Sequence, residues 1–118
     1  MRESIVNAVV AHGGEDAPSA LRRLAAYEKQ QAVRRQIVSA FGRLSSKDSV
    51  HYLVEFAMRD ESYYGEVADA LGRIGQVAPE QSRGMLGRIM KSSRSGYVEQ
   101  ATAADALDRL DRTEAAAL

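Results

Sequence analysis

The sequence contains no cysteine and no tryptophan. Without cysteine, the chain has no disulfide framework, no thiolate nucleophile and no sulfur-ligated metal site. Long apolar runs are also missing, and none approaches the length that spans a bilayer, so no membrane partner is expected. The short apolar stretch at 5–11 is interrupted by Asn7 and fits a first helix better than a cleaved leader. A cytoplasmic location is therefore the default expectation.

A net charge is missing as well, because 16 Lys and Arg side chains balance 16 Asp and Glu side chains. The chain therefore has no overall field that would attract nucleic acid or an anionic membrane. Sustained alternation of apolar and polar residues, the pattern of a half-buried β-strand, is nearly absent. These features predict an all-α protein, and the 118 residues suffice for a single domain, 1–118, with one continuous core.

What the sequence does contain is one repeated pattern. Its clearest copy is VADALGRIG at 67–75, with related copies IVSAFGRL at 37–44 and AADALDRL at 103–110, and a weaker one, IVNAVVAH, at 5–12. Each copy places apolar or small residues at i, i+3, i+4 and i+7, which is the spacing of one face of a helix. A helix that returns about every thirty residues is typical of a stacked helical array.

Turn and capping residues between the copies predict seven helices. Gly13 and Gly14 end the first helix, and Pro18 and Pro79 occupy first-turn positions of the second and the sixth. Serine and aspartate residues at 45–48 offer caps for the fourth helix. The helices with the clearest limits are expected at about 2–12, 48–59, 79–91 and 97–111, the third carries an apolar stripe from 33 to 44, and residues 113–118 are expected to fray.

The small residues of the pattern have a predicted role in packing. The buried side of the fifth helix is expected to consist of Val67, Ala70, Leu71 and Ile74, while Ala70 and Gly72 permit close approach of neighbouring helices. Two interpretations are open for Gly84 and Gly87 in the sixth helix. Either another backbone approaches closely at these positions, or the glycines simply make the helix weaker.

The stretch VRRQIVSAFGRL at 33–44 resembles the helix of HEAT-like repeats, above all the short variety of phycobilisome-lyase-type proteins. ALGRIG at 70–75 resembles the end of the same unit, and the resemblance covers about 4–110. It implies a right-handed α-α superhelix, a HEAT-like solenoid of three helix pairs plus one C-terminal capping helix, with repeats at about 1–29, 30–60 and 61–95 and a half repeat at 96–112. One helix of each pair would line a concave face. A polar outer cap on the last helix would consist of Asp105, Asp108, Arg109 and Arg112.

Proteins similar to this family mostly bind other proteins. The leading expectation is therefore a non-catalytic interaction, scaffold or regulatory module that binds a protein partner through its concave face. A minority of the family attach or remove bilin pigments, so a bilin lyase or lyase-like subunit acting on phycobiliproteins is the alternative, by resemblance alone. A weak nucleic-acid-binding module is a third interpretation, which the zero net charge disfavours. Self-association through apolar ends of the stack stays open.

No catalytic, cofactor or metal site is expected. The sequence has no nucleophile elbow and no glycine-rich phosphate loop. His51 and Glu55 are four residues apart on one helix face and offer two metal ligands. Zinc sites usually need three or four protein ligands, so the pair is interpreted as an ordinary helix face.

Basic residues gather locally in spite of the overall neutrality. If the even-numbered helices line the concave surface, Arg22, Arg23, Arg88 and Lys91 form a basic stripe suited to an acidic protein partner. The competing interpretation is that they are the solvated faces of amphipathic helices. Tyrosines at 52, 63 and 64 either contact a partner or seal the junction between repeats. The expected partner-binding residues are Arg22, Arg23, Tyr52, Glu55, Arg59, Arg88 and Lys91.

Overall fold

The computed structural model of the chain describes residues 2–92 and 95–117, and no β-strand occurs in this part of the chain. The helices are α1 (Arg2–His12), α2 (Ala17–Tyr27), α3 (Gln31–Phe41), α4 (Lys47–Arg59), α5 (Tyr64–Ile74), α6 (Pro79–Lys91) and α7 (Tyr97–Ala117). Short 3-10 turns precede α2, α5 and α6. The expected all-α class is confirmed. None of the described helices combines the length and apolar character needed to cross a bilayer.

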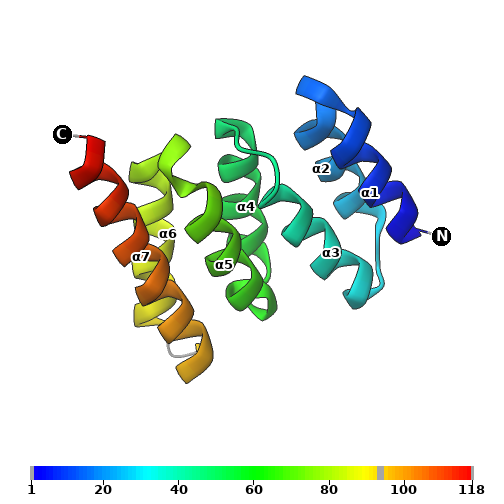
Figure 1. Cartoon of the computed structure of the whole chain (residues 1–118). Coiled ribbons are helices and arrows are strands. Elements are labelled where there is room, and N and C mark those ends of the chain that lie inside the picture. The colour runs from blue at the N-terminus through cyan, green and yellow to red at the C-terminus, as the bar shows by residue number, and fades with distance from the viewer. Residues whose placement is uncertain (1, 93–94, 118) are drawn as a thin grey trace.

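The helices pack in two rows (Figure 1). The odd-numbered helices contact one another in the order α1, α3, α5 and α7, and the even-numbered helices do so in the order α2, α4 and α6. Each even-numbered helix also contacts its odd-numbered neighbours in the chain. The molecule measures 39 × 34 × 17 Å. Because packed helix axes lie about 8–10 Å apart, the shortest dimension fits two helix layers.

The repeated pattern supplies much of the core, as expected. In α5, Val67, Ala70 and Leu71 are fully buried and Ile74 is almost so. Six of the eight matching positions in the other two clear copies are also buried, namely Ile37, Ala40, Phe41, Ala103, Ala106 and Leu110. The wide apolar face of α4 is covered on several sides, since this helix contacts α2, α3, α5 and α6. One continuous core therefore runs through the helix rows.

Glycine in the pattern allows neighbouring odd-numbered helices to approach closely. A Cβ atom on Gly42 would lie 3.0 Å from the Cβ of Ala70, and one on Gly72 would lie 3.1 Å from the Cβ of Ala106. The expected close approach at Ala70 and Gly72 is thus confirmed. The explanation by close approach is wrong for Gly84 and Gly87, because a Cβ there would meet no atom of another described helix within 4 Å. Both glycines simply weaken α6.

The helix starts follow the predicted signals. The Ser46 side chain accepts a hydrogen bond from the Ser49 backbone N–H at 3.1 Å and so caps α4. Prolines occupy the first turns of α2 and α6. The third helix ends at Phe41, ahead of the expected limit at Leu44, which lies beyond the helix and is only partly buried.

The C-terminal end differs from the expectation. Residues 113–117 do not fray, and α7 continues to Ala117, while Leu118 lies outside the described residues. A long-range contact supports this end of the helix, because the Arg83 guanidinium of α6 binds Asp111 Oδ1 and Glu114 Oε2, each at 2.7 Å. The hydrogen bonds that Arg83 donates to Glu114 and Asp111 raise the pKa of its guanidinium group.

The outer face of α7 is polar, as expected for the end of a helical array. Asp105 pairs with Arg109 at 3.0 Å, and Asp108 pairs with Arg112 at 2.6 Å. All four side chains are more than half exposed. Such i, i+4 pairs support the helix itself and make this stretch of its surface polar.

Candidate functional site

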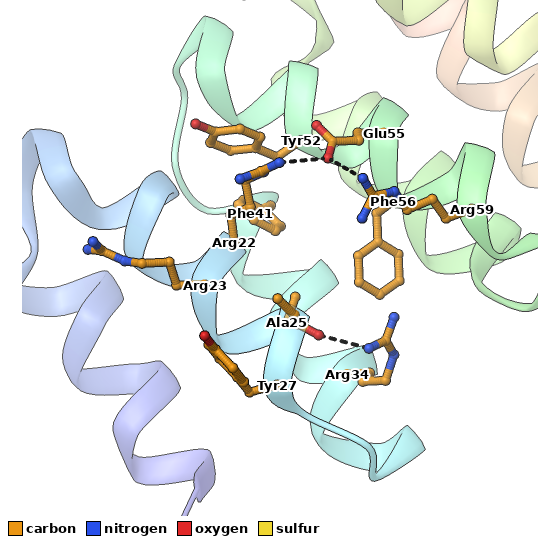
Figure 2. A pocket seen from close by; sticks show the side chains of 11 residues that line it. Arg22, Arg23, Ala25, Tyr27, Arg34, Phe41, Tyr52, Glu55, Phe56 and Arg59 are labelled. Atoms are coloured by element: carbon orange, nitrogen blue, oxygen red, sulfur yellow. Dashed lines mark hydrogen bonds and ion pairs between the residues drawn. The ribbon is translucent and has the colours of Figure 1, made fainter.

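A hollow of about 330 Å³ opens between α2, α3 and α4 (Figure 2). Its lining combines four arginines, four aromatic rings, two alanines and a single carboxylate, namely Arg22, Arg23, Ala25, Ala26, Tyr27, Arg34, Phe41, Tyr52, Glu55, Phe56 and Arg59. The hollow lies where the first helix pair meets the second. It therefore exists only because α2 packs beside α4.

Glu55 is the centre of the charged network in this hollow. Its Oε1 atom lies 3.1 Å from Arg22 Nη2 and 3.3 Å from Arg59 Nη2. Its Oε2 atom lies 3.7 Å from His51 Nε2. The carboxylate is 27% exposed, whereas the side chains of Arg22 and Arg59 are 51% and 75% exposed. Two guanidinium groups thus share one carboxylate oxygen and remain open to solvent.

Arg34 forms the inner wall of the hollow and has a structural role. Its Nη1 donates hydrogen bonds to the backbone oxygens of Ala25, at 2.8 Å, and Glu28, at 2.9 Å. Its guanidinium lies 4.7 Å from the centre of the Phe56 ring and 5.7 Å from that of Tyr63. The cation therefore caps the C-terminal carbonyls of α2 and joins them to the aromatic residues of the next pair.

Aromatic rings form the apolar part of the lining. The Arg22 guanidinium lies 5.5 Å from the centre of the Tyr52 ring, which packs against Phe41 at 6.0 Å. Tyr63 and Tyr64 are buried, at 2% and 4% exposure, so they seal the junction between helix pairs. Tyr52 is only partly buried and belongs to the wall of the hollow.

The structure brings together five of the seven residues expected to bind a partner. Arg22, Arg23, Tyr52, Glu55 and Arg59 line the hollow. Arg88 and Lys91 lie on α6, and α4 contacts both α2 and α6. Among the described residues, Arg23, Arg88 and Lys91 are exposed and have no ion pair or side-chain hydrogen bond. The basic stripe stays a prediction, and Glu55 interrupts its positive charge.

Six residues of the lining were not among the expected partner-binding residues, namely Ala25, Ala26, Tyr27, Arg34, Phe41 and Phe56. Ala25, Phe41 and Phe56 belong to the buried core and only border the hollow. Tyr27 ends α2 with 85% of its surface exposed. Its position away from the apolar stripe of α2 was the signal available, because a large ring outside that stripe has no core to enter.

A second hollow, of about 260 Å³, lies between α1, α2 and α3. Its lining is almost wholly apolar, consisting of Ile5, Val6, Leu24, Tyr27, Glu28, Val33 and Ile37. Ile5 is 49% exposed beside it. Nothing in the structure shows what covers this surface, so self-association stays a prediction.

The lining of the first hollow limits the chemistry it supports. The described residues include no group of three or more His, Asp or Glu side chains placed to hold a metal ion. Guanidinium groups and aromatic rings bind anionic and apolar groups, whereas a covalent reaction would need a nucleophile beside a general base. No family model, curated protein or solved structure matches the chain significantly. Function must therefore be inferred from the surface itself.

Proposed function

We propose that this chain is a protein–protein interaction module without catalytic activity. In this proposal the helices form a short right-handed α-α superhelix of HEAT-like repeats, and α7 closes its C-terminal end. A protein partner binds the concave face, which the even-numbered helices line. Support comes from the two rows of helices, from the glycine–alanine contacts that recur between odd-numbered helices, and from the polar outer face of α7.

The observation on which the proposal rests is the hollow between α2 and α4. Arginine and aromatic residues are enriched where protein interfaces have their strongest contacts. Arg22, Arg23 and Arg59 gather here beside Tyr52 and Phe56, around a concave surface. A solvated helix face would explain exposed arginines, but it would not explain why they line a hollow together with aromatic rings.

Site-directed cross-linking tests this proposal. Because the chain has no cysteine, a single cysteine can carry a photoreactive label at any chosen position. Arg23→Cys places the label on α2 at the hollow, and Ala104→Cys places it on exposed α7 in the other row. In an extract of cells that make the protein, we expect one polypeptide to be cross-linked from position 23 and not from position 104. Equal labelling from both positions would overturn the proposal.

Charge reversal then locates the contact along the even-numbered row. Arg88→Glu with Lys91→Glu changes α6, and Arg22→Glu changes the hollow. Loss of cross-linking with Arg22→Glu alone places the partner on α2 and α4. Loss with the α6 pair alone moves the contact to α6. Loss with both variants indicates a partner that spans all three helices.

A further inference from the structure

We infer that the hollow binds an acidic segment of a partner protein, and that Glu55 competes with this segment for Arg22 and Arg59. The inference rests on the proposed function and names the chemistry of the partner. In the bound state an aspartate or glutamate of the partner accepts hydrogen bonds from the two guanidinium groups. An apolar residue beside it packs on the aromatic lining.

The first support is the excess of hydrogen-bond donors. A guanidinium group has five N–H donors, and a carboxylate accepts about four hydrogen bonds. Arg22 and Arg59 both use a single Nη2 atom on the same oxygen of Glu55. Arg23 has no partner among the described residues. A second carboxylate can therefore be bound without breaking any backbone hydrogen bond.

The second support is the order of exposure. Arg59 and Arg22 are 75% and 51% exposed, and Glu55 is 27% exposed. A ligand approaching from solvent therefore meets the guanidinium groups before it meets the carboxylate. Figure 2 shows Arg22 and Arg59 pointing toward Glu55 from opposite sides, with Phe56 beneath Arg59. Once bound, a ligand acid would lie beside both cations and an aromatic face.

The composition of the lining favours a peptide over a nucleic acid. Four arginines and one carboxylate line the hollow, but the positive charge is local, since Asp105, Asp108 and Asp111 lie exposed on α7. A nucleic acid needs a basic track that follows several phosphates. The accessible aromatic surface of the lining, formed by Tyr27 and Tyr52, suits an apolar side chain next to the acid.

The carboxylate of Glu55 has two opposing effects on the binding of an acidic ligand. In the free protein its carboxylate holds Arg22 and Arg59 in position, and it also repels an incoming acid. Glu55→Gln keeps the shape of the side chain and removes its negative charge. If Glu55 is a competitor, this change strengthens binding of an acidic ligand. If Glu55 only positions the arginines, the same change weakens binding.

Fluorescence anisotropy with defined peptides measures the affinity of the hollow for an acidic ligand. The probe is a labelled peptide, Asp-Glu-Phe-Asp-Glu flanked by glycines, and its neutral analogue replaces each acid by the amide. We expect the acidic probe to bind and the analogue not to bind. Glu55→Gln should tighten binding about threefold or more, and the double variant Arg22→Gln and Arg59→Gln should weaken it about tenfold. Circular dichroism confirms that each variant is folded.

The matched control is Arg109→Gln with Arg112→Gln, which removes the same charge from exposed, ion-paired arginines of α7, in the other row of helices. We expect it to change the affinity by less than about twofold. Equal loss in the control, equal binding of the neutral peptide, or weaker binding by Glu55→Gln would overturn the inference. So would tighter binding of a single-stranded oligonucleotide of the same charge. If no peptide binds while position 23 still cross-links a partner, the inference fails and the proposed function stands. If a partner is cross-linked only from position 104, the proposed function itself is refuted.

Discussion

Gly42 lies directly against Ala70. A Cβ atom on Gly42 would be 3.0 Å from the Cβ of Ala70 and 3.1 Å from its Cα. The φ angle of Gly42 is −67°, which any residue adopts, so glycine is needed here for space and not for conformation. The contact sets how closely α3 approaches α5, and Gly72 repeats it against Ala106 between α5 and α7.

We therefore expect Gly42→Ala to lower the free energy of unfolding by about 1–3 kcal/mol, the usual cost of overpacking. The added methyl group meets backbone as well as side-chain atoms, so a rotamer change cannot relieve the clash. Urea unfolding followed by far-ultraviolet circular dichroism measures the loss. An unchanged midpoint would show that α3 and α5 can separate at no cost.

The glycines of α6 should behave in the opposite way. Apart from its chain neighbours and the nearby backbone of α6, no atom of the described residues lies within 4 Å of a Cβ placed on Gly84 or Gly87. Alanine reduces the conformational freedom of the unfolded chain, so Gly84→Ala and Gly87→Ala should each raise the free energy of unfolding by about 0.5–1 kcal/mol. The same urea measurement checks this, with Gly42→Ala as the variant of opposite sign. A loss of stability would mean that α6 needs glycine for a reason other than space.

The opposite roles of these glycines show how far the sequence could be interpreted. The helical period predicted the order of the helices and the buried positions of α5, because both depend on residues close together in the chain. It also predicted that Gly72 permits close approach. It could not separate Gly72 from Gly84, because the difference depends on what stands opposite each one in space. Residues 113–117 were mispredicted for the same reason, since Arg83 that holds them lies on another helix.

The candidate site was predictable only in part. Arg22 and Arg23 were expected to belong to a basic stripe on the even-numbered helices, and five of the seven expected residues meet at one hollow. The hollow itself depends on how α2 packs beside α4, and no local sequence pattern determines that packing. The hydrogen bonds from Arg34 to the end of α2 are likewise a product of packing.

Arg34 provides a further prediction, because its Nη1 donates to two backbone oxygens while the plane of the guanidinium group covers Phe56. Lysine has no planar group that could make both contacts at once. We expect Arg34→Lys to cost about 2 kcal/mol of stability, the range for hydrogen bonds that involve a charged group. The control is Arg35→Lys, whose exposed side chain pairs with Glu66 at 3.4 Å and should change stability by less than about 1 kcal/mol. Equal effects of the two variants would contradict the structural role of Arg34.

The last turns of α7 depend on Arg83, and hydrogen exchange can show it. Arg83 of α6 reaches Asp111 and Glu114, whereas Arg109 pairs only within α7, with Asp105. Exposed ion pairs contribute at most about 1 kcal/mol, so Arg83→Gln should speed amide exchange at 110–117 by about two- to fivefold. Arg109→Gln loses a pair inside the helix and should leave the contact between α6 and the end of α7 unchanged. If Arg109→Gln speeds exchange at 110–117 as much as Arg83→Gln does, the end of α7 is stabilised by its own helix and not by α6.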